Sequence, residues 1–204
     1  MAVVTYYLSL NSPWSYLGSR RLIEMTRRLG VPVDVKPAKY GVVFAETGGL
    51  PLAKRPPARR AYRMMDLSRW RDHLAIPIVL EPRHFPSDET AGTRLVIATA
   101  RAGQDALTLS SEIGRALWER EENIADPAVL VAAAARAGID VDKVSATAPS
   151  DAELDAIWDA NTTEAVSRGV FGAPSYVLAS GEIFWGQDRL DFLERALQRE
   201  QAGS

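Results

Sequence analysis

The residue that most suggests chemistry is Ser12, which lies between a strand-like run and the start of a helix. Pro13 follows it, and proline favours the first helical position because the amide it lacks would have no partner there. The Ser12 hydroxyl is therefore expected beside unpaired amides and the positive end of the helix dipole. Such a position attracts anions and lowers thiol pKa values, which indicates thiolate binding; the alternative is a serine that only caps its helix.

Sulfur chemistry at this serine requires a thiol supplied by a ligand, because the chain contains no cysteine. The same absence excludes disulfides, thiolate metal sites and a cysteine nucleophile within the chain. The two histidines, His73 and His84, do not have a spacing typical of zinc or iron ligands. We therefore expect no metal centre.

A second candidate cluster lies near the carboxyl terminus, at Ala173-Pro174 and Gln187-Asp188. A cis bond before Pro174 would leave a backbone edge free for a peptide-like ligand, although most bonds before proline are trans. Gln187 and Asp188 come where a helix is expected to begin, and Asp188 would by default be its N-cap. In the functional alternative, these two residues and the helix-start amides hold the charged end of an amino-acid-like ligand.

Basic residues are concentrated before and within a predicted helix. Such a run is usually a solvated face, whereas the functional alternative is a site for carboxylates. Tyr62 and Asp66 are one helical turn apart and share a face, with core packing of Tyr62 as the alternative. Trp14 either lines an aromatic pocket or belongs to the core. The basic cluster consists of Lys54, Arg55, Arg59, Arg60 and Arg63.

Hydrophobic periodicity and turn signals predict the elements that position these residues. A strand at residues 3–8 leads into a helix at 13–29, and Gly30 and a strand at 31–35 complete a right-handed β-α-β unit. Helical patterns then dominate up to residue 149 without a comparable strand signal. The helices expected there cover residues 59–73, 90–101, 107–121 and 127–137.

Sheet-forming sequence returns near the end of the chain. A capping box at Ser150 opens a helix that reaches residue 168, strands at 175–179 and 182–185 form a hairpin, and residues 188–198 form a final helix. This order predicts an α/β, thioredoxin-like fold (β-α-β … α-β-β-α) with a large all-α insertion. The expected domains are residues 1–40 plus 150–204 for the sheet and 41–149 for the insertion.

Composition narrows the class of protein further. The 204 residues, 47% of them hydrophobic, are sufficient for one globular unit or a small domain with a large insertion. A net charge of -2 is not typical of nucleic-acid binding. No apolar run approaches the roughly 20 residues of a membrane-spanning helix, and residues 1–8 do not have signal-peptide architecture. We expect a cytoplasmic protein without nucleic-acid or membrane partners.

Four motifs occur in order along the chain: SPWSYL at residues 12–17, YRMMDL at 62–67, GVFGAP at 169–174 and FWGQDRL at 184–190. Together they resemble the 2-hydroxychromene-2-carboxylate isomerase family, which belongs with the kappa-class glutathione transferases and the DsbA-like oxidoreductases. The resemblance covers essentially the whole chain and implies a thioredoxin fold with a helical insertion, a homodimer, and glutathione bound with its sulfur at Ser12.

The resemblance also implies roles for residues in the matching motifs. Ser12 would stabilise the glutathione thiolate, Ala173 before a cis-Pro174 would bond the cysteinyl part, and Gln187 and Asp188 would hold the γ-glutamyl end. On the predicted helix, Tyr62, Asp66 and Arg59 would contribute to the same site, and Lys54, Arg60 and Trp14 would contact an aromatic substrate. The stretch at residues 46–54 departs from the lysine and asparagine substrate contacts of the naphthalene-pathway enzymes. The family's glutathione-binding residues can therefore be assigned to this sequence more directly than its substrate-binding residues.

The reaction implied by the resemblance interconverts 2-hydroxychromene-2-carboxylate and trans-o-hydroxybenzylidenepyruvate in bacterial naphthalene breakdown. Reversible addition of the thiolate to the conjugated carbon permits rotation about the bond and leaves glutathione unconsumed. Two other readings stay open: a kappa-like glutathione transferase that consumes the thiol, and a non-catalytic binding module on the same fold. Dithiol oxidoreductase activity is excluded by the absence of cysteine.

Overall fold

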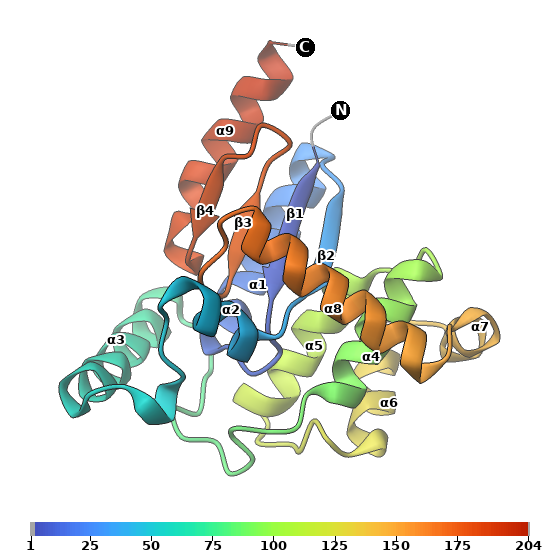
Figure 1. The fold of residues 1–204 in the computed structure, drawn as a ribbon, viewed down its shortest axis with the longest axis horizontal. Helices are drawn as coiled ribbons and strands as arrows, with labels where there is room; N and C mark the ends of the chain where they lie inside the picture. Colours follow the sequence, from blue (N-terminus) through green and yellow to red (C-terminus); the bar gives the residue numbers. More distant parts are fainter. Residues whose placement is uncertain (1–2, 204) are drawn as a thin grey trace.

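The computed structural model describes residues 3–203, with a four-stranded mixed sheet at its centre (Figure 1). β1 and β2 run parallel, whereas β3 pairs antiparallel with β1 and with β4. The β-α-β unit and the hairpin expected from the sequence are thereby confirmed, as is the α/β, thioredoxin-like fold with a helical insertion. The strands are, in spatial order, β2 (Val33–Pro37), β1 (Val4–Leu8), β3 (Ser175–Val177) and β4 (Ile183–Trp185).

Helices cover both faces of the sheet. Alternate residues of β1 point to opposite faces, and their buried side chains pack against different helices. Tyr6 belongs to the larger hydrophobic cluster, which includes residues of two helices on one face. Tyr7 belongs to a smaller cluster on the opposite face, formed with two other helices. The first pair of helices is α1 (Pro13–Leu29) and α9 (Leu190–Ala202), and the second is α2 (Tyr40–Thr47) and α8 (Asp151–Ser167).

The helix that carries Ser12 has the bounds expected from the sequence. Ser12 has extended backbone angles (φ -84°, ψ 116°), and its hydroxyl accepts a hydrogen bond from the Ser15 amide. At the other end, Gly30 adopts a left-handed conformation (φ 65°) that residues other than glycine rarely adopt, and its amide donates to the Arg27 carbonyl. Both ends of α1 are therefore determined by local interactions.

The helical insertion contains two helices that the sequence did not predict, α2 and the short α7. α2 contains Gly41 and the β-branched Val42 and Val43, which disfavour helix in isolation. Buried Val43 and Tyr40 hold it through packing. The other helices lie close to their expected positions, and the insertion consists of α3 (Pro57–Leu74), α4 (Thr90–Arg101), α5 (Ala106–Trp118), α6 (Pro127–Arg136) and α7 (Val141–Thr147), after α2 and a 3-10 turn at Leu52–Lys54.

The prediction that Asp188 caps the final helix is wrong. A 3-10 turn at Gln187–Arg189 precedes α9, and the helix begins without a side-chain cap. The chain enters this turn at Gly186 with φ 105°, a conformation that the local sequence pattern did not reveal. The Asp188 carboxylate instead lies 3.0 Å from the Arg189 guanidinium. It is therefore not engaged as a helix cap.

α8 is tied to the sheet through Glu164. The Tyr7 hydroxyl and the Lys36 ammonium donate to the two carboxylate oxygens at 2.7 and 2.5 Å. Burial favours the neutral acid, but these hydrogen bonds outweigh it and lower the pKa of Glu164 below its usual range. The ionised carboxylate therefore helps to hold α8 against β1 and β2.

The predicted division into a sheet domain and a helical domain stays a prediction. The larger hydrophobic cluster is continuous between the two, since it contains Leu17 of α1 as well as Leu117 of α5. Within residues 3–203, no helix is long and apolar enough to span a membrane. The same residues contain no group of acidic or histidine side chains suited to a metal ion.

Candidate glutathione site

The fold places Ser12 at the junction of β1 and α1, half-buried at the start of the helix. Its hydroxyl oxygen accepts from the Ser15 amide at 3.2 Å, and its proton faces the Ala173 carbonyl at a long 3.5 Å. The first turn of α1 carries no acidic side chain that would neutralise the helix dipole. Ser12 can therefore donate a hydrogen bond to an anion that lies beside helix-start amides.

Ala173 lies across from Ser12, and the bond to Pro174 is cis. The Pro174 carbonyl accepts from the Gly186 amide, while the Gly172 carbonyl accepts from the hydroxyls of Ser175 and Tyr40. Among the residues described, the Ala173 amide donates to no acceptor. The half-buried Ala173 thus presents a free backbone donor next to the Ser12 hydroxyl, as a peptide ligand requires.

Gln187 and Asp188 lie in the turn that follows β4, but their side chains face different surroundings. Gln187 is only 1% exposed, and Arg21 donates to both its side-chain oxygen (2.9 Å) and its carbonyl (3.1 Å). Its side chain is therefore committed to contacts within the protein. Asp188 is half-buried and close to the Gly186 backbone: a methyl group on Gly186 would lie 2.4 Å from its carboxylate.

α3 places Asp66 near this turn. Burial raises the pKa of Asp66, the positive charge of Arg69 lowers it, and the negative charge of Asp188 raises it, so Asp66 lies within electrostatic range of Asp188. Tyr62, one turn away, is 56% exposed, which rules out the core-packing alternative for this residue. The structure therefore brings Ser12, Ala173 and Asp188 into one region, with α3 contributing Asp66.

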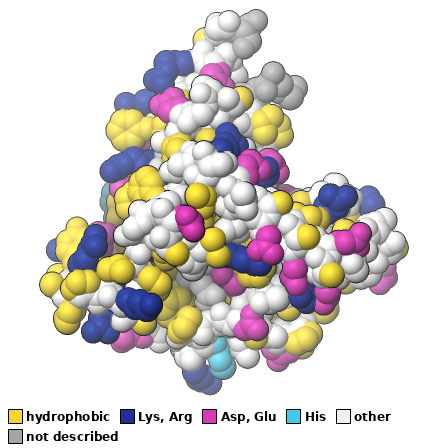
Figure 2. Space-filling model, in the orientation of Figure 1, with side chains coloured by type: hydrophobic (Ala, Val, Ile, Leu, Met, Phe, Trp, Pro, Cys, Tyr) yellow, Lys and Arg dark blue, Asp and Glu magenta, His cyan; other side chains and the backbone are white. Residues whose placement is uncertain are grey.

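The basic cluster surrounds the first half of α3, on the side of the molecule where Figure 2 shows Lys and Arg side chains among hydrophobic ones. Lys54, Arg59 and Arg60 are exposed. Arg63 is half-buried over the Phe85 ring at 5.7 Å, and burial together with the Arg55 charge lowers its pKa to about 10. Within residues 3–203, no member of the cluster forms a salt bridge. These positive charges are available to anionic ligands.

Trp14, the aromatic residue predicted to contact substrate, is half-buried and packs against the large hydrophobic cluster. It lies in the first turn of α1, beside Ser12. This half-buried position is compatible with both alternatives raised by the sequence, core packing and contact with a ligand.

Glu89 is a half-buried residue of this region that the sequence analysis missed. Its carboxylate accepts from the Ser9 hydroxyl (2.9 and 3.1 Å) and the Asn11 amide (3.1 Å). The Asn11 side chain also exchanges two hydrogen bonds with the Ser87 backbone. These contacts anchor the loop before Ser12 to the segment before α4. No sequence signal could indicate them, because Glu89 is 78 residues from Asn11.

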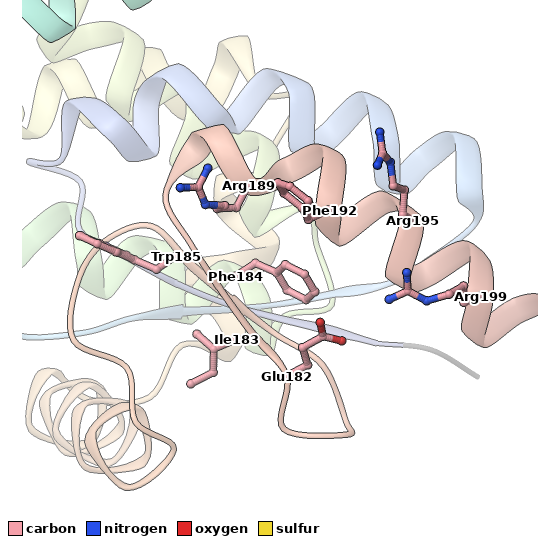
Figure 3. A pocket seen from close by; sticks show the side chains of 8 residues that line it. All are labelled: Glu182, Ile183, Phe184, Trp185, Arg189, Phe192, Arg195 and Arg199. Atoms are coloured by element: carbon pink, nitrogen blue, oxygen red, sulfur yellow. The ribbon is translucent and has the colours of Figure 1, made fainter.

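A groove of about 610 Å³ lies between β4 and α9 (Figure 3). Trp185 and Arg189 lie at one end of it, and Glu182 and Arg199 lie at the other. None of the site residues expected from the sequence lines this groove. Arg189, which lines this groove, forms an ion pair with Asp188.

Comparison with known proteins supports the same group of families. A 2-hydroxychromene-2-carboxylate isomerase from Sphingobium xenophagum is 30% identical over 196 residues, which cover 95% of this chain and 97% of the relative. Human glutathione S-transferase kappa 1 is 26% identical over 220 residues, covering 98% and 92%. A solved 2-hydroxychromene-2-carboxylate isomerase structure is similar with a TM-score of 0.75 at 26% identity, covering 97% and 95%.

The family model of the DSBA-like thioredoxin domain matches residues 3–198. This range includes the sheet, the helical insertion, and every residue of the Ser12 region. The agreement of the fold, the near-complete matches to the relatives and this family match lead to one conclusion: the chain belongs to the family of DsbA-like thioredoxin domains.

Proposed function

We propose that this protein is a glutathione-dependent isomerase of conjugated aromatic keto acids, with 2-hydroxychromene-2-carboxylate as the model substrate. The observation that carries the proposal is the half-buried Ser12 hydroxyl, which lies at a helix start and faces the backbone of Ala173 before a cis proline. The relatives named above are isomerases and glutathione transferases, which supports an enzyme that uses glutathione. The absence of cysteine from the chain supports a thiol supplied by that ligand.

The surroundings of Ser12 suit a thiolate better than a neutral thiol. Among residues 3–203, its proton has only the distant Ala173 carbonyl as an acceptor, so an anion in the site would receive it. The helix dipole acts in the same direction. A decrease of about two units from a thiol pKa of about 8.5 would raise the thiolate fraction at pH 7 from roughly 3% to roughly 75%.

The remainder of glutathione would be held by backbone groups and carboxylates. The free amide and the carbonyl of Ala173 would bond the cysteinyl part as in a short β-pairing. Asp188 would attract the γ-glutamyl ammonium, while the first amides of the Gln187–Arg189 turn would bond its carboxylate. Gln187 would thus contribute its backbone, because its side chain is held by Arg21.

α3 would complete both halves of the site. We assign Tyr62, Asp66 and Arg59 to the glutathione side, where Asp66 lies close enough to Asp188 to feel its charge. These three residues would form the wall of the site opposite Ala173. This arrangement would close the glutathione site between α3 and the turn that follows β4.

The substrate half would use positive charge and an aromatic wall. When bound, glutathione would supply a thiolate that adds reversibly to the conjugated carbon, so that the double bond becomes single, rotates and re-forms. Lys54 and Arg60, which are exposed, would bind the substrate carboxylate and the developing oxyanion. Trp14, at the first turn of α1, would contact the aromatic ring.

A kappa-like glutathione transferase is the second candidate, favoured by the match to human glutathione S-transferase kappa 1. The two candidates share the glutathione half of the site and differ in the fate of the thiol. An isomerase returns the thiol after each turnover, whereas a transferase releases it in a conjugate.

One pair of assays tests the proposal. With 2-hydroxychromene-2-carboxylate, an isomerase changes the ultraviolet spectrum only when glutathione is present, and the total thiol stays constant. A transferase consumes thiol with chlorodinitrobenzene instead. Ser12→Ala is the matched control, for which we expect reduced turnover. If the wild-type protein changes neither spectrum nor thiol content, both candidates are wrong.

A further inference from the structure

A small cavity lies beneath Ser12, between α1, β1 and α5. Its volume is about 10 Å³, close to the smallest cavity that admits a single water molecule. Most of the residues that line it carry a hydroxyl: Tyr6, Ser9, Ser12, Ser15, Tyr16, Ser19 and Ser110. A cavity with several hydroxyls in its wall binds water, whereas an apolar cavity of this size stays dry.

Ser15 differs from the deeper serines of this cavity. The Ser19 hydroxyl donates to the Tyr16 carbonyl, and the Ser110 hydroxyl donates to the Leu107 carbonyl, each at 2.8 Å. The Ser15 hydroxyl is buried, with the residue 4% exposed, and has no hydrogen-bond partner within residues 3–203. A buried hydroxyl without a partner costs about 1–3 kcal/mol, which a bound water would relieve.

We propose that this cavity holds one water molecule, which accepts the Ser15 proton and donates to the Ser12 oxygen, so that Ser15 acts as a positioning residue for the thiolate site. The inference rests on the proposed function, because it deepens the role of Ser12 toward bound glutathione. The Tyr6 hydroxyl lines the same cavity and gives the water a third partner. Burial raises the pKa of Tyr6, and the Ser15 hydroxyl, which is near it but outside hydrogen-bonding geometry, lowers that pKa.

The hydrogen-bonding capacity of Ser12 permits this chain of donors. A hydroxyl oxygen has two acceptor positions, and the Ser15 amide uses one of them. The water would use the second, which leaves the Ser12 proton for the thiolate. Every donor would then point toward the anion, and hydrogen bonds arranged in series strengthen one another. The Ser15 amide and hydroxyl would thus act on the same oxygen.

The experiment compares Ser15→Ala with the control Ser110→Ala. The control also removes a hydroxyl from the cavity wall, but the Ser110 hydroxyl already donates to a backbone carbonyl. Thiolate absorbance of bound glutathione, titrated against pH, gives the thiol pKa of each complex. We expect Ser15→Ala to reduce the thiol acidity constant roughly 3- to 10-fold, as loss of one hydrogen bond would. In Ser110→Ala, the thiol pKa of bound glutathione should stay at the wild-type value. S-methylglutathione has no ionisable thiol, and both variants should bind it with the wild-type affinity.

The outcomes separate this inference from the proposed function. If wild-type protein does not bind glutathione, the proposed function fails and the inference fails with it. If glutathione binds but Ser15→Ala leaves the thiol pKa unchanged, the inference alone is overturned, and the buried hydroxyl is only a structural feature. A crystal structure of the wild-type complex provides a check that needs no variant: a water within hydrogen-bonding distance of Ser15 and Ser12 supports the inference, and a dry cavity overturns it.

Discussion

Replacing Ser12 with alanine should raise the pKa of bound glutathione and reduce turnover. The substitution removes the hydroxyl that faces the Ala173 carbonyl at 3.5 Å and that we expect to donate to the thiolate. It leaves the helix-start amides and the dipole of α1 in place. The effect on the thiol therefore measures the hydroxyl alone.

The expected magnitude follows from the hydrogen bond that is lost. A hydrogen bond to a charged group contributes about 1.5–3 kcal/mol, which corresponds to about one to two pKa units. From a bound thiol pKa of about 6.5, the loss would raise the value to about 7.5–8.5. The thiolate fraction at pH 7 would fall from roughly 75% to between roughly 25% and 3%. Turnover that depends on the thiolate falls with it.

The assay is a pH titration of thiolate absorbance at saturating glutathione, followed by isomerisation rates across the same pH range. Ser12→Ala also removes a helix cap, at a cost of about 1 kcal/mol in unfolding free energy. Ser150→Ala is the matched control, because Ser150 caps α8 in a capping box with Glu153. It should lower stability similarly without changing the thiol. Equal thiol pKa values in Ser12→Ala and wild type would refute the reasoning.

Three further predictions concern other parts of the molecule. A methyl group on Gly172 would lie 2.3 Å from the Trp185 indole nitrogen, so Gly172→Ala should lower the unfolding free energy by about 1–3 kcal/mol in urea denaturation; unchanged stability would contradict the packing. Asp188→Asn should weaken glutathione binding about 10-fold in calorimetry and lower the pKa of Asp66 in an NMR titration, because a repelling charge is removed; an unchanged Asp66 would show that the two carboxylates do not interact. The lowered pKa of Glu164 means that its ionised form stabilises the fold above its unfolded value near 4.5, and that this stability is lost as the pH falls through the lower folded value. Glu164→Gln should therefore flatten the acid limb of the stability curve below about pH 4.5, and an identical limb in both proteins would contradict this.

Asp188 illustrates how a local rule can fail in the candidate site. An aspartate before a helical pattern usually caps the helix, but here the preceding Gly186 turns the chain at φ 105°. Arg21 of α1 then binds Gln187 and holds the turn against the core. The carboxylate is left beside Arg189 and free of a capping role, which suits a residue that binds a ligand.

The sequence alone determined the features that arise between neighbours in the chain. The position of Ser12 at a helix start follows from Pro13 and from a hydrogen bond three residues away. The end of α1 at Gly30 and the capping box at Ser150 have the same local origin. The order of these elements was sufficient to indicate a thioredoxin-like sheet with a helical insertion, which the structure confirms.

Only the tertiary structure decided which distant residues meet. Ala173 is 161 residues from Ser12, and the sheet brings them together because β3 pairs with β1. The anchoring of the Ser12 loop by Glu89 likewise depends on how the insertion packs. α2 forms through burial of Val43 despite weak helix propensity. Local propensity reflects a few neighbouring residues, whereas these contacts require the whole sheet and its helices to be in place.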